Sequence, residues 1–240
     1  MTREFPAISV QQTLKLVIAP VHPEGWPFIA ISVLVTIMLA LIDVSIGWIG
    51  AIVTGWCVYF FRDPERVTPT RPGLVVSPGD GRVVSVAAAP PPEEIGMGSE
   101  PRTRIGIFLS TFDVHVNRVP ADGVVKTLAY RPGRFINASL DKASEANERM
   151  AVRLALADGR DLAFVQVAGL IARRILCTLT EGQTVRSGQR YGMIRFGSRV
   201  DLYLPTGVAP LVLVGQRVIG GETVLADLTS AEPARAGEVR

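Results

Sequence analysis

The sequence has few of the residues that hold metals or form disulfides. It contains two cysteines, Cys57 and Cys177, and two histidines, His22 and His115, among 240 residues. There is no CxxC pair and no Cys/His cluster, which favours reduced, buried thiols over a disulfide or a metal site. Two histidines also leave almost nothing from which to build a multi-histidine site. We therefore expect no metal cofactor.

Long runs of like charge are also missing. The 25 basic residues are matched by 22 acidic ones, and no block of lysine and arginine suggests a nucleic-acid partner. The P-loop, the G-x-S-x-G elbow and the H-E-x-x-H motif are absent too. The sequence therefore gives no support to nucleotide-binding, serine-hydrolase or zinc-protease activity of those types.

What the chain does have is a long apolar segment, residues 27–61, whose single charge is Asp43. A membrane-spanning helix needs roughly 20 apolar residues, so the two runs on either side of Asp43 are short or borderline. Two interpretations stay open: a tight helical hairpin with Asp43 at its turn, or a re-entrant insertion in one leaflet. Basic residues flank both ends, which predicts a cytoplasmic location for the rest of the chain. Residues 8–19 are expected to form an amphipathic helix on the bilayer surface.

After residue 61 the pattern becomes that of a β protein. Short runs of alternating apolar residues are separated by glycine and proline, which is typical of an all-β sandwich or barrel. Asp158-Gly159 is expected at a hairpin turn, residues 87–101 as a mobile surface loop, and residues 137–149 as a loop with a helical turn. We divide the chain into a membrane-proximal segment (1–26), an apolar hairpin (27–61), a β-rich domain (62–228) and a flexible tail (229–240).

Two polar positions stand out in the β-rich domain. Asp80 lies between two glycines in "SPGDGRV", a pattern that indicates a tight turn at the start of a strand. His115, in "STFDVHVNRVP", is the one histidine outside the membrane-proximal region. Strand alternation places it on the same face as Asp113 and Asn117. Histidine is the side chain best suited to proton transfer near neutral pH, so His115 is a candidate catalytic base.

The pair Gly197-Ser198 interrupts a good strand pattern in "RFGSRVDLYLP". Glycine leaves its carbonyl unshielded, so an attack by the Ser198 hydroxyl on that carbonyl would shift the acyl group from nitrogen to oxygen. Such a shift needs a base for the hydroxyl and donors for the developing oxyanion. Asp80 and His115 are the natural candidates for these tasks.

At this point the ordered set of motifs resembles the pyruvoyl-dependent phosphatidylserine decarboxylases, in their short form with two apolar segments. The matching stretches are "FRDPER" (61–66), "SPGDGRV" (77–83), "STFDVHVNRVP" (110–120), "YRPGRFINASLDKASEANER" (130–149), "VQVAGLIARRI" (165–175) and "RFGSRVDLYLP" (195–205). The resemblance implies a mainly β fold, a barrel-sandwich with a lipoyl/biotinyl-like hammerhead core, preceded by an apolar helical membrane hairpin.

The resemblance also implies a self-processing proenzyme. The chain would break between Gly197 and Ser198 by the acyl shift and β-elimination, and loss of ammonia would turn Ser198 into a pyruvoyl group. The β chain (1–197) and α chain (198–240) would stay associated, with further homo-oligomerisation left open. The pyruvoyl ketone would form a Schiff base with phosphatidylserine and accept the electrons left by CO2, giving phosphatidylethanolamine without pyridoxal phosphate or a metal.

The site residues implied by the resemblance are Ser198, His115 and Asp80, acting at the cell membrane. This sequence departs from the longer forms at one position: they carry a second histidine where Arg118 stands, and arginine is a poor base near pH 7. Either His115 therefore covers both proton transfers or Asp80 acts more directly, and His115 is our candidate for the base. As ligands for the lipid phosphate we consider Arg131, Arg134 and Arg173.

Two alternatives remain open. "SPGDGRVVSV" and "EGQTVRSGQRYGMIRFGS" are similar to hairpins of lipoyl and biotinyl carrier domains, so a membrane-anchored adaptor or carrier without catalysis is conceivable. None of the three lysines, Lys15, Lys126 and Lys142, lies at a hairpin tip where a prosthetic group would be attached, which argues against a carrier. The second alternative is a decarboxylase of a different serine phospholipid.

Overall fold

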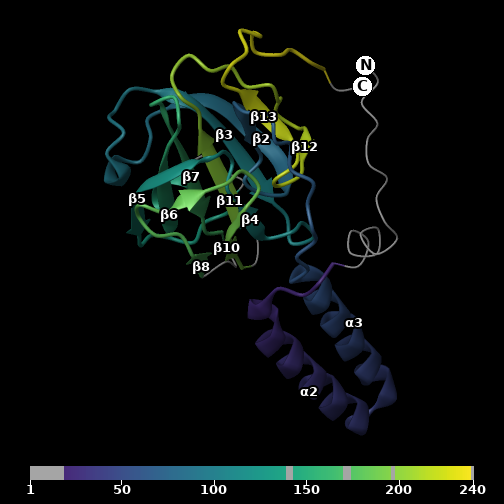
Figure 1. The fold of residues 1–240 in the computed structure, drawn as a ribbon. Coiled ribbons are helices and arrows are strands. Elements are labelled where there is room, and N and C mark those ends of the chain that lie inside the picture. Colours follow the sequence, from purple (N-terminus) through teal and green to yellow (C-terminus); the bar gives the residue numbers. More distant parts are fainter. Residues whose placement is uncertain (1–18, 139–142, 170–173, 196–197, 239–240) are drawn as a thin grey trace. The chain divides into compact units, whose positions relative to one another are not determined.

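The structure is a computed structural model that describes residues 19–138, 143–169, 174–195 and 198–238 (Figure 1). The expected amphipathic helix at 8–19 falls almost entirely outside these residues. The chain divides into two compact units, Met1–Arg66 and Val67–Arg240. The first is helical and the second is built from strands.

The helical unit contains a short turn, η1 (Pro23–Gly25), followed by helices α2 (Trp26–Ile42) and α3 (Val44–Phe60). Asp43 ends the first helix and caps the second, because its Oδ1 accepts hydrogen bonds from the backbone N–H groups of Ser45 (2.7 Å) and Ile46 (3.2 Å). These two helices agree with the predicted hairpin and with Asp43 at its turn.

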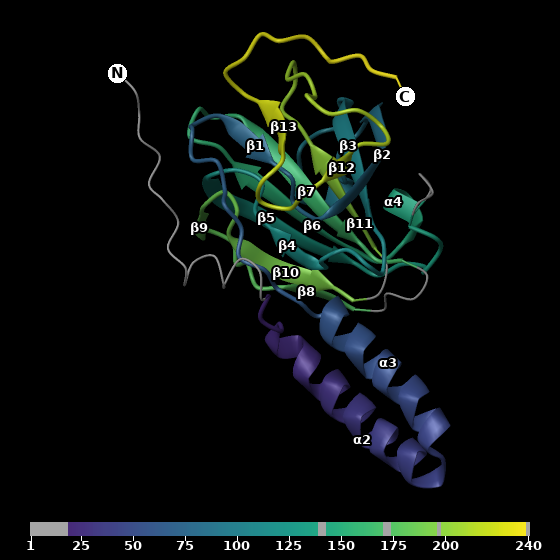
Figure 2. The same ribbon diagram turned by 90° about the vertical axis from the view of Figure 1, so that its right-hand side faces the viewer.

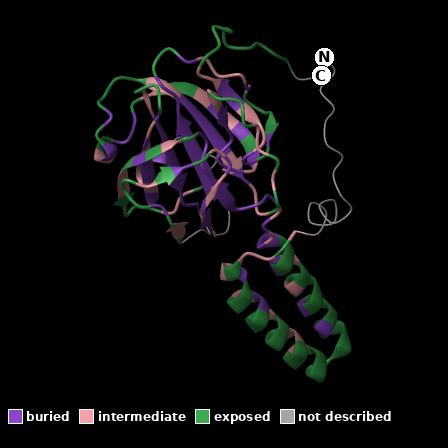
Figure 3. Ribbon diagram, in the orientation of Figure 1, coloured by how far each residue is buried: buried purple, intermediate pink, exposed green. Residues whose placement is uncertain are grey.

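The two helices pack closely through small residues. A Cβ on Gly47 would lie 2.6 Å from that of Ala40, and one on Gly50 would lie 2.8 Å from the hydroxyl of Thr36. Large apolar side chains such as Leu41, Trp48 and Ile52 point outward instead, and most of the helical surface is exposed (Figure 3). Pro23–Ile42 is long and apolar enough to cross a membrane, whereas Val44–Phe60 is shorter. An apolar surface of this size indicates membrane association.

The second unit is dominated by a curled, antiparallel, eight-stranded sheet, which confirms the mainly β prediction (Figures 1 and 2). Its strands, in spatial order, are β12 (Arg217–Val218), β2 (Gly81–Ala89), β3 (Arg102–Leu109), β11 (Ser198–Tyr203), β7 (Asp161–Val167), β6 (Arg149–Ala155), β5 (Gly123–Arg131) and β9 (Thr184–Val185). The predicted hairpin between β6 and β7 is present, with Gly159 at φ 83°.

Two smaller antiparallel sheets accompany it. The three-stranded sheet has the order β4 (Val116–Arg118), β10 (Arg190–Ile194), β8 (Ile175–Cys177), and the two-stranded sheet pairs β1 (Leu74–Val76) with β13 (Val224–Asp227). The main core joins them to one face of the large sheet, called here the inner face, which carries Val200 and Leu202. Phe164 of the large sheet packs against Tyr191 of the three-stranded sheet, with ring centroids 4.9 Å apart.

The opposite, outer face of the large sheet carries Arg199, Asp201 and Tyr203. It is covered by the segment after β2, which includes the turn η2 (Glu93–Ile95). The prediction of a mobile surface loop at 87–101 is therefore wrong. Strand β2 runs to Ala89, and Ile95 and Met97 are buried in a second apolar cluster on this face. The helical turn expected in 137–149 is present as α4 (Ala143–Ala146).

Candidate active site

The turn that carries Asp80 is fixed from several sides. The hydroxyl of Ser77 donates to the carbonyl of Gly79 (2.6 Å), and the backbone N–H of Arg118 donates to the carbonyl of Pro78 (2.9 Å). Oδ1 of Asp80 accepts a hydrogen bond from the N–H of Gly220 at 2.8 Å. This carboxylate is therefore held in place by backbone geometry.

His115 lies just before β4 and is fully buried. Its Nδ1 is 3.0 Å from the carbonyl oxygen of Asp113, and its own carbonyl accepts from the N–H of Ile194 at 3.3 Å. A carbonyl oxygen can only accept a hydrogen bond, so Nδ1 carries the proton and, in the neutral ring, Nε2 keeps its lone pair. The ring thus presents Nε2 as the basic atom.

Asp113 is itself held by three donors. Its carboxylate accepts from the backbone N–H (2.9 Å) and the hydroxyl (2.7 Å) of Ser110, and from Nη2 of Arg217 (3.0 Å). These bonds fix the loop before β4 and so fix the carbonyl that orients His115.

Ser198 is the first residue of β11 and is fully buried. It is paired with Leu109 of β3, and strand alternation places its side chain on the inner face with Val200 and Leu202. Among the described residues, its Oγ has no hydrogen-bond partner. A buried hydroxyl without a partner costs about 1–3 kcal/mol, so a reason other than stability is needed for its presence.

Two buried amides occupy the same inner side. Nε2 of Gln166, on β7, donates to Oδ1 of Asn117 (2.8 Å) and to the carbonyl of Leu176 (3.2 Å). Within the described part of the chain, Nδ2 of Asn117 and Oε1 of Gln166 have no partner. Glycines make room for both amides: a Cβ on Gly79 would lie 3.3 Å from Asn117 Nδ2, and one on Gly192 would lie 3.1 Å from Gln166 Nε2.

The strand register brings these residues together. Gly79, which precedes Asp80, would touch both Asn117 and Leu109 if it had a side chain, and Leu109 is the cross-strand partner of Ser198. Gln166 is paired with Val200, so it stands diagonally to Ser198 with their Cβ atoms about 7–8 Å apart. We call Asp80, Asn117, Gln166 and Ser198 the polar cluster, and we include His115, two residues before Asn117, as its candidate base.

The polar cluster is a suitable setting for acyl chemistry. It contains a buried hydroxyl, an imidazole with a defined basic nitrogen and amide groups with unused hydrogen-bonding capacity. Burial raises the pKa of Tyr191 and of Cys177, so both stay protonated near neutral pH and are poor bases. Sequence reasoning missed Gln166, although a lone polar residue in the apolar stretch "FVQVA" was a visible signal.

On the outer face, β11 is secured by a buried ion pair. Nε of Arg199 is 2.5 Å from Oδ1 of Asp201, and Nη2 of Arg199 donates to the hydroxyl of Ser85 at 2.7 Å. A Cβ on Gly106 would lie 2.2 Å from that guanidinium, so only glycine leaves room for it. Together with the ladders to β3 and β7, the pair fixes β11 within the sheet.

Arg118 adjoins the turn of Asp80 through its backbone, and its side chain is directed to another turn. Its Nη1 donates to the carbonyl of Gly188 (2.9 Å), and its Cδ is 2.8 Å from where a Cβ on Gly221 would be. Strand alternation along β4 points it away from the side that carries His115 and Asn117. Arg118 therefore links β4 to the turn around Gly188.

The other predicted residues differ in where they lie. Gly197 and Arg173 are outside the described residues. Arg134 is exposed on the segment after β5. Arg131 of β5 is paired with Arg149 of β6, which is paired with Val167 of β7, and Val167 is paired with Arg199 of β11. Three strand spacings, about 14 Å, therefore separate Arg131 from β11. Arg131 does not share the polar cluster with Ser198. Among the residues that the structure describes, no group of three or more His, Cys, Asp or Glu residues is placed to hold a metal ion.

Comparisons with known proteins agree with one another. A family described as phosphatidylserine decarboxylase matches residues 53–226. The chain is 60% identical over 221 residues to a phosphatidylserine decarboxylase proenzyme of Paramagnetospirillum magneticum, covering 92% of each chain. It is 59% identical to the proenzyme of Cereibacter sphaeroides, covering 95% of this chain and 98% of the relative. A third proenzyme, from Granulibacter bethesdensis, is 57% identical, with 92% and 91% covered.

Proposed function

The chain belongs to the phosphatidylserine decarboxylase family, and we propose that Ser198 is the residue from which its pyruvoyl group is made. The protein is a phosphatidylserine decarboxylase proenzyme, a lyase of phospholipid biosynthesis that forms phosphatidylethanolamine and CO2. The carrier alternative is set aside because the chain belongs to a family of decarboxylases.

The observation that carries the assignment to Ser198 is its buried Oγ without a hydrogen-bond partner at the start of β11. Burial keeps bulk water away, so the hydroxyl rather than water is the nucleophile available to the preceding carbonyl. Attack of Oγ on the Gly197 carbonyl carbon breaks the peptide C–N bond and leaves an ester with a free amine on Ser198. Removal of the Ser198 α-proton then forms the Cα=Cβ double bond and breaks the Cβ–Oγ bond, which releases Gly197 as a carboxylate. The remaining dehydroalanine takes up water and loses ammonia.

We assign proton transfer to His115. Its Nε2 is the basic atom because Nδ1–H is committed to the carbonyl of Asp113. Asn117 is our candidate donor for the oxyanion that forms when the carbonyl is attacked, because its Nδ2 still has hydrogens to donate. Asp80, fixed by Gly220 beside the same end of β11, is proposed to support His115 electrostatically when the ring is protonated.

Processing divides the chain into β (1–197) and α (198–240) chains, and we propose that they remain a heterodimer because β11 is held on both sides. Its ladders reach β3 and β7, and Arg199 and Asp201 anchor its outer face. The pyruvoyl ketone supplies the electron sink for loss of CO2. The residues of the polar cluster then serve to orient the serine headgroup, exclude water and return a proton.

We further propose that the helical hairpin holds the catalytic domain at the cytoplasmic face of the cell membrane. Its large exposed apolar side chains support insertion, and the basic residues beside it support that side. Arg134 and Arg173 remain our proposed ligands for the lipid phosphate. The finer fold, a barrel-sandwich similar to lipoyl and biotinyl domains, is supported by the packing of β4-β10-β8 against the curled sheet.

The assignment is tested on a denaturing gel with the purified full-length protein. Wild type is expected to separate into fragments 1–197 and 198–240, whereas Ser198→Ala stays a single chain of 25.8 kDa. Ser187→Ala, which changes another serine of the β-stranded unit Val67–Arg240, is the matched control and should process normally. A folded wild type that never divides would contradict the proposal. Release of CO2 from phosphatidylserine, compared with other serine phospholipids and blocked by borohydride, then identifies the substrate.

A further inference from the structure

A hollow of about 330 Å³ lies on the outer face of the large sheet, beneath the segment that follows β2. Its floor comes from β3, β11, β6 and β5, and α4 closes one side. The lining residues are Ala89, Pro90, Pro91, Pro92, Glu93, Arg104, Arg131, Ser144, Arg149 and Tyr203. Three of these ten residues are arginines.

Positive charge exceeds negative charge around this hollow. Arg104 and Arg149 are buried, at 7% and 5% exposure, and Arg131 is more open. The carboxylate of Glu94 binds Arg149 through two bonds of 2.6 and 2.9 Å and lies 4.0 Å from Arg131. Among the described lining residues, Glu93 is the one acidic side chain. Three guanidinium groups therefore meet two carboxylates, and the neighbouring Arg199–Asp201 ion pair leaves this balance unchanged.

Neutral donors complete the lining. Burial, together with the charge of Asp201, raises the pKa of Tyr203 to about 12, so its hydroxyl keeps its proton at physiological pH. Tyr203 stands directly opposite Arg104 in the register of β11 and β3. Ser144 is 5% exposed, and within the described residues its Oγ has no hydrogen-bond partner. Buried hydroxyls and arginines gathered around a small hollow are the groups that bind phosphate oxygens.

We propose that this hollow, which we call the arginine pocket, binds a phosphate group, either free or as the headgroup of an anionic phospholipid. Its volume is at the small end of ligand pockets, which suits a phosphate with a short alcohol substituent. The pocket opens on the face opposite Ser198, and its residue from β11, Tyr203, is at the other end of that strand, about 17 Å from Ser198. In phosphatidylserine only the serine Cα, Cβ and an ester oxygen separate amine from phosphate. A phosphate in the arginine pocket therefore belongs to a molecule other than the one undergoing decarboxylation.

The test measures thermal unfolding of the full-length, processed protein in neutral detergent at constant ionic strength. Inorganic phosphate at ten times its dissociation constant should raise Tm by about 3–6 °C over a chloride control. Arg104→Gln and Arg131→Gln should each weaken binding at least tenfold. Lys126→Gln removes the same charge from an exposed site on β5 and should leave the shift unchanged. Arg131 is exposed enough for its variant to fold even if Arg104→Gln does not.

A second arm replaces phosphate with phosphatidylglycerol in the detergent micelles. A shift with phosphate alone identifies a free-phosphate site, and a shift with the lipid alone identifies a headgroup site, provided that Arg131→Gln abolishes it. No shift with either, or equal shifts in Arg131→Gln and Lys126→Gln, would overturn the proposal. Ser198→Ala is expected to lose processing but to keep the phosphate-induced rise in Tm. The arginine-pocket proposal and the Ser198 assignment can therefore fail independently of each other.

Discussion

At the scale of single residues, the question is which groups move protons around Ser198. The resemblance implies a second histidine in the longer forms where this chain has Arg118, which raises the question of what replaces that base. The side chain of Arg118 is directed to the carbonyl of Gly188, whereas Asn117 accepts a hydrogen bond from Gln166, which stands diagonally to Ser198. We therefore propose that the site of this chain is organised around one imidazole and two amides.

His115 is expected to act in the first step, the acyl shift. His115→Gln should slow processing by about a hundredfold or more, the usual contribution of a general base. Hydroxylamine cleaves esters, so it also reports which step has failed. If His115 is needed for the shift, the variant forms no ester and hydroxylamine gives no cleavage at 197–198. Rapid cleavage by hydroxylamine would instead assign His115 to the elimination step alone.

Restoring the missing histidine should not help. In Arg118→His the shorter side chain no longer reaches the carbonyl of Gly188, so a buried charged hydrogen bond is lost at a cost of about 2 kcal/mol. The new imidazole would point away from Ser198. We expect a lower unfolding midpoint and no faster processing on a time course. Faster processing at unchanged stability would show that position 118 does reach the reacting atoms.

Asn117 separates a role in catalysis from a role in folding. Replacement by leucine, of similar size, removes the buried hydrogen bond from Gln166 Nε2, which still donates to the carbonyl of Leu176, so we expect a loss of about 1–3 kcal/mol of stability. If Asn117 donates to the oxyanion, Asn117→Leu should slow processing about 10²–10³-fold. The time course on a gel and the unfolding midpoint measure the two effects separately. Gln183→Leu, a change in a glutamine outside the polar cluster, is the control and should process at the normal rate.

At the scale of elements, the sequence predicts what depends on local pattern. Alternating apolar residues predict the strands, Asp158-Gly159 predicts the hairpin of β6 and β7, and Asp43 predicts the turn between the helices. Non-local pairing is beyond such patterns: nothing local places β11 between β3 and β7. Ile95 and Met97 stand alone among proline, glycine and acidic residues, so no period indicates that they pack against the sheet. The burial of Gln166 likewise depends on a neighbour, Asn117, that is distant in sequence.

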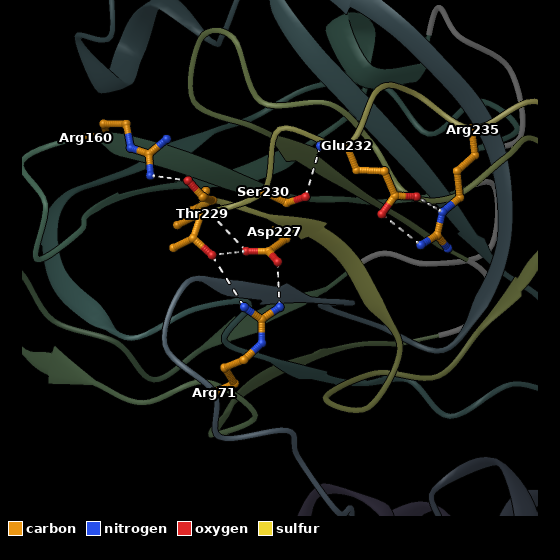
Figure 4. A network of polar contacts seen from close by, with 8 residues as sticks. Arg71, Arg160, Asp227, Thr229, Ser230, Glu232 and Arg235 are labelled. Atoms are coloured by element: carbon orange, nitrogen blue, oxygen red, sulfur yellow. Dashed lines mark hydrogen bonds and ion pairs between the residues drawn. The ribbon is translucent and has the colours of Figure 1, made fainter.

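The ribbon of β1 and β13 is tied to the preceding connector by charged groups (Figure 4). Nη2 of Arg71 is 2.5 Å from Oδ2 of Asp227, and Oδ1 of Asp227 accepts from the N–H (2.9 Å) and hydroxyl (2.7 Å) of Thr229. These bonds lower the pKa of Asp227 from 3.8 to about 2, the bond from Arg71 contributing most. A carboxyl whose folded pKa is lowered stabilises the fold above its unfolded pKa and loses that contribution as the pH falls.

Asp227→Asn should therefore be less stable than wild type near neutral pH. The difference in unfolding free energy between the two proteins should shrink as the pH falls from about 4 to 2. Arg71 is largely exposed, so we expect the difference to be about 1 kcal/mol or less. Unfolding midpoints measured across pH 2 to 7 give the comparison. Glu100→Gln removes an exposed carboxyl from the loop before β3 and serves as the control for general charge effects. A difference that stays constant down to pH 2 would contradict the linkage.

At the scale of the whole molecule, two units divide the work. Val67–Arg240 has its own buried core and contains every residue of the polar cluster, whereas Met1–Arg66 has an apolar, exposed helical surface. Phosphatidylserine has two acyl chains and stays in the bilayer. We propose that the helices anchor the catalytic unit, which would then search for its substrate along a surface rather than through the solution volume.

Deleting residues 1–61 should leave self-processing largely intact, because none of the groups proposed to move protons lies in that segment. Activity on phosphatidylserine in liposomes should fall at least tenfold, since the truncated enzyme must find the membrane by diffusion. The matched control uses a short-chain, water-soluble phosphatidylserine, on which the two proteins should be equally active. A loss on both substrates would mean that the helices support the catalytic unit itself. Equal activity of the two proteins on liposomes would mean that the unit Val67–Arg240 reaches the bilayer without the helices. Access to the substrate would then depend on the surface of that unit.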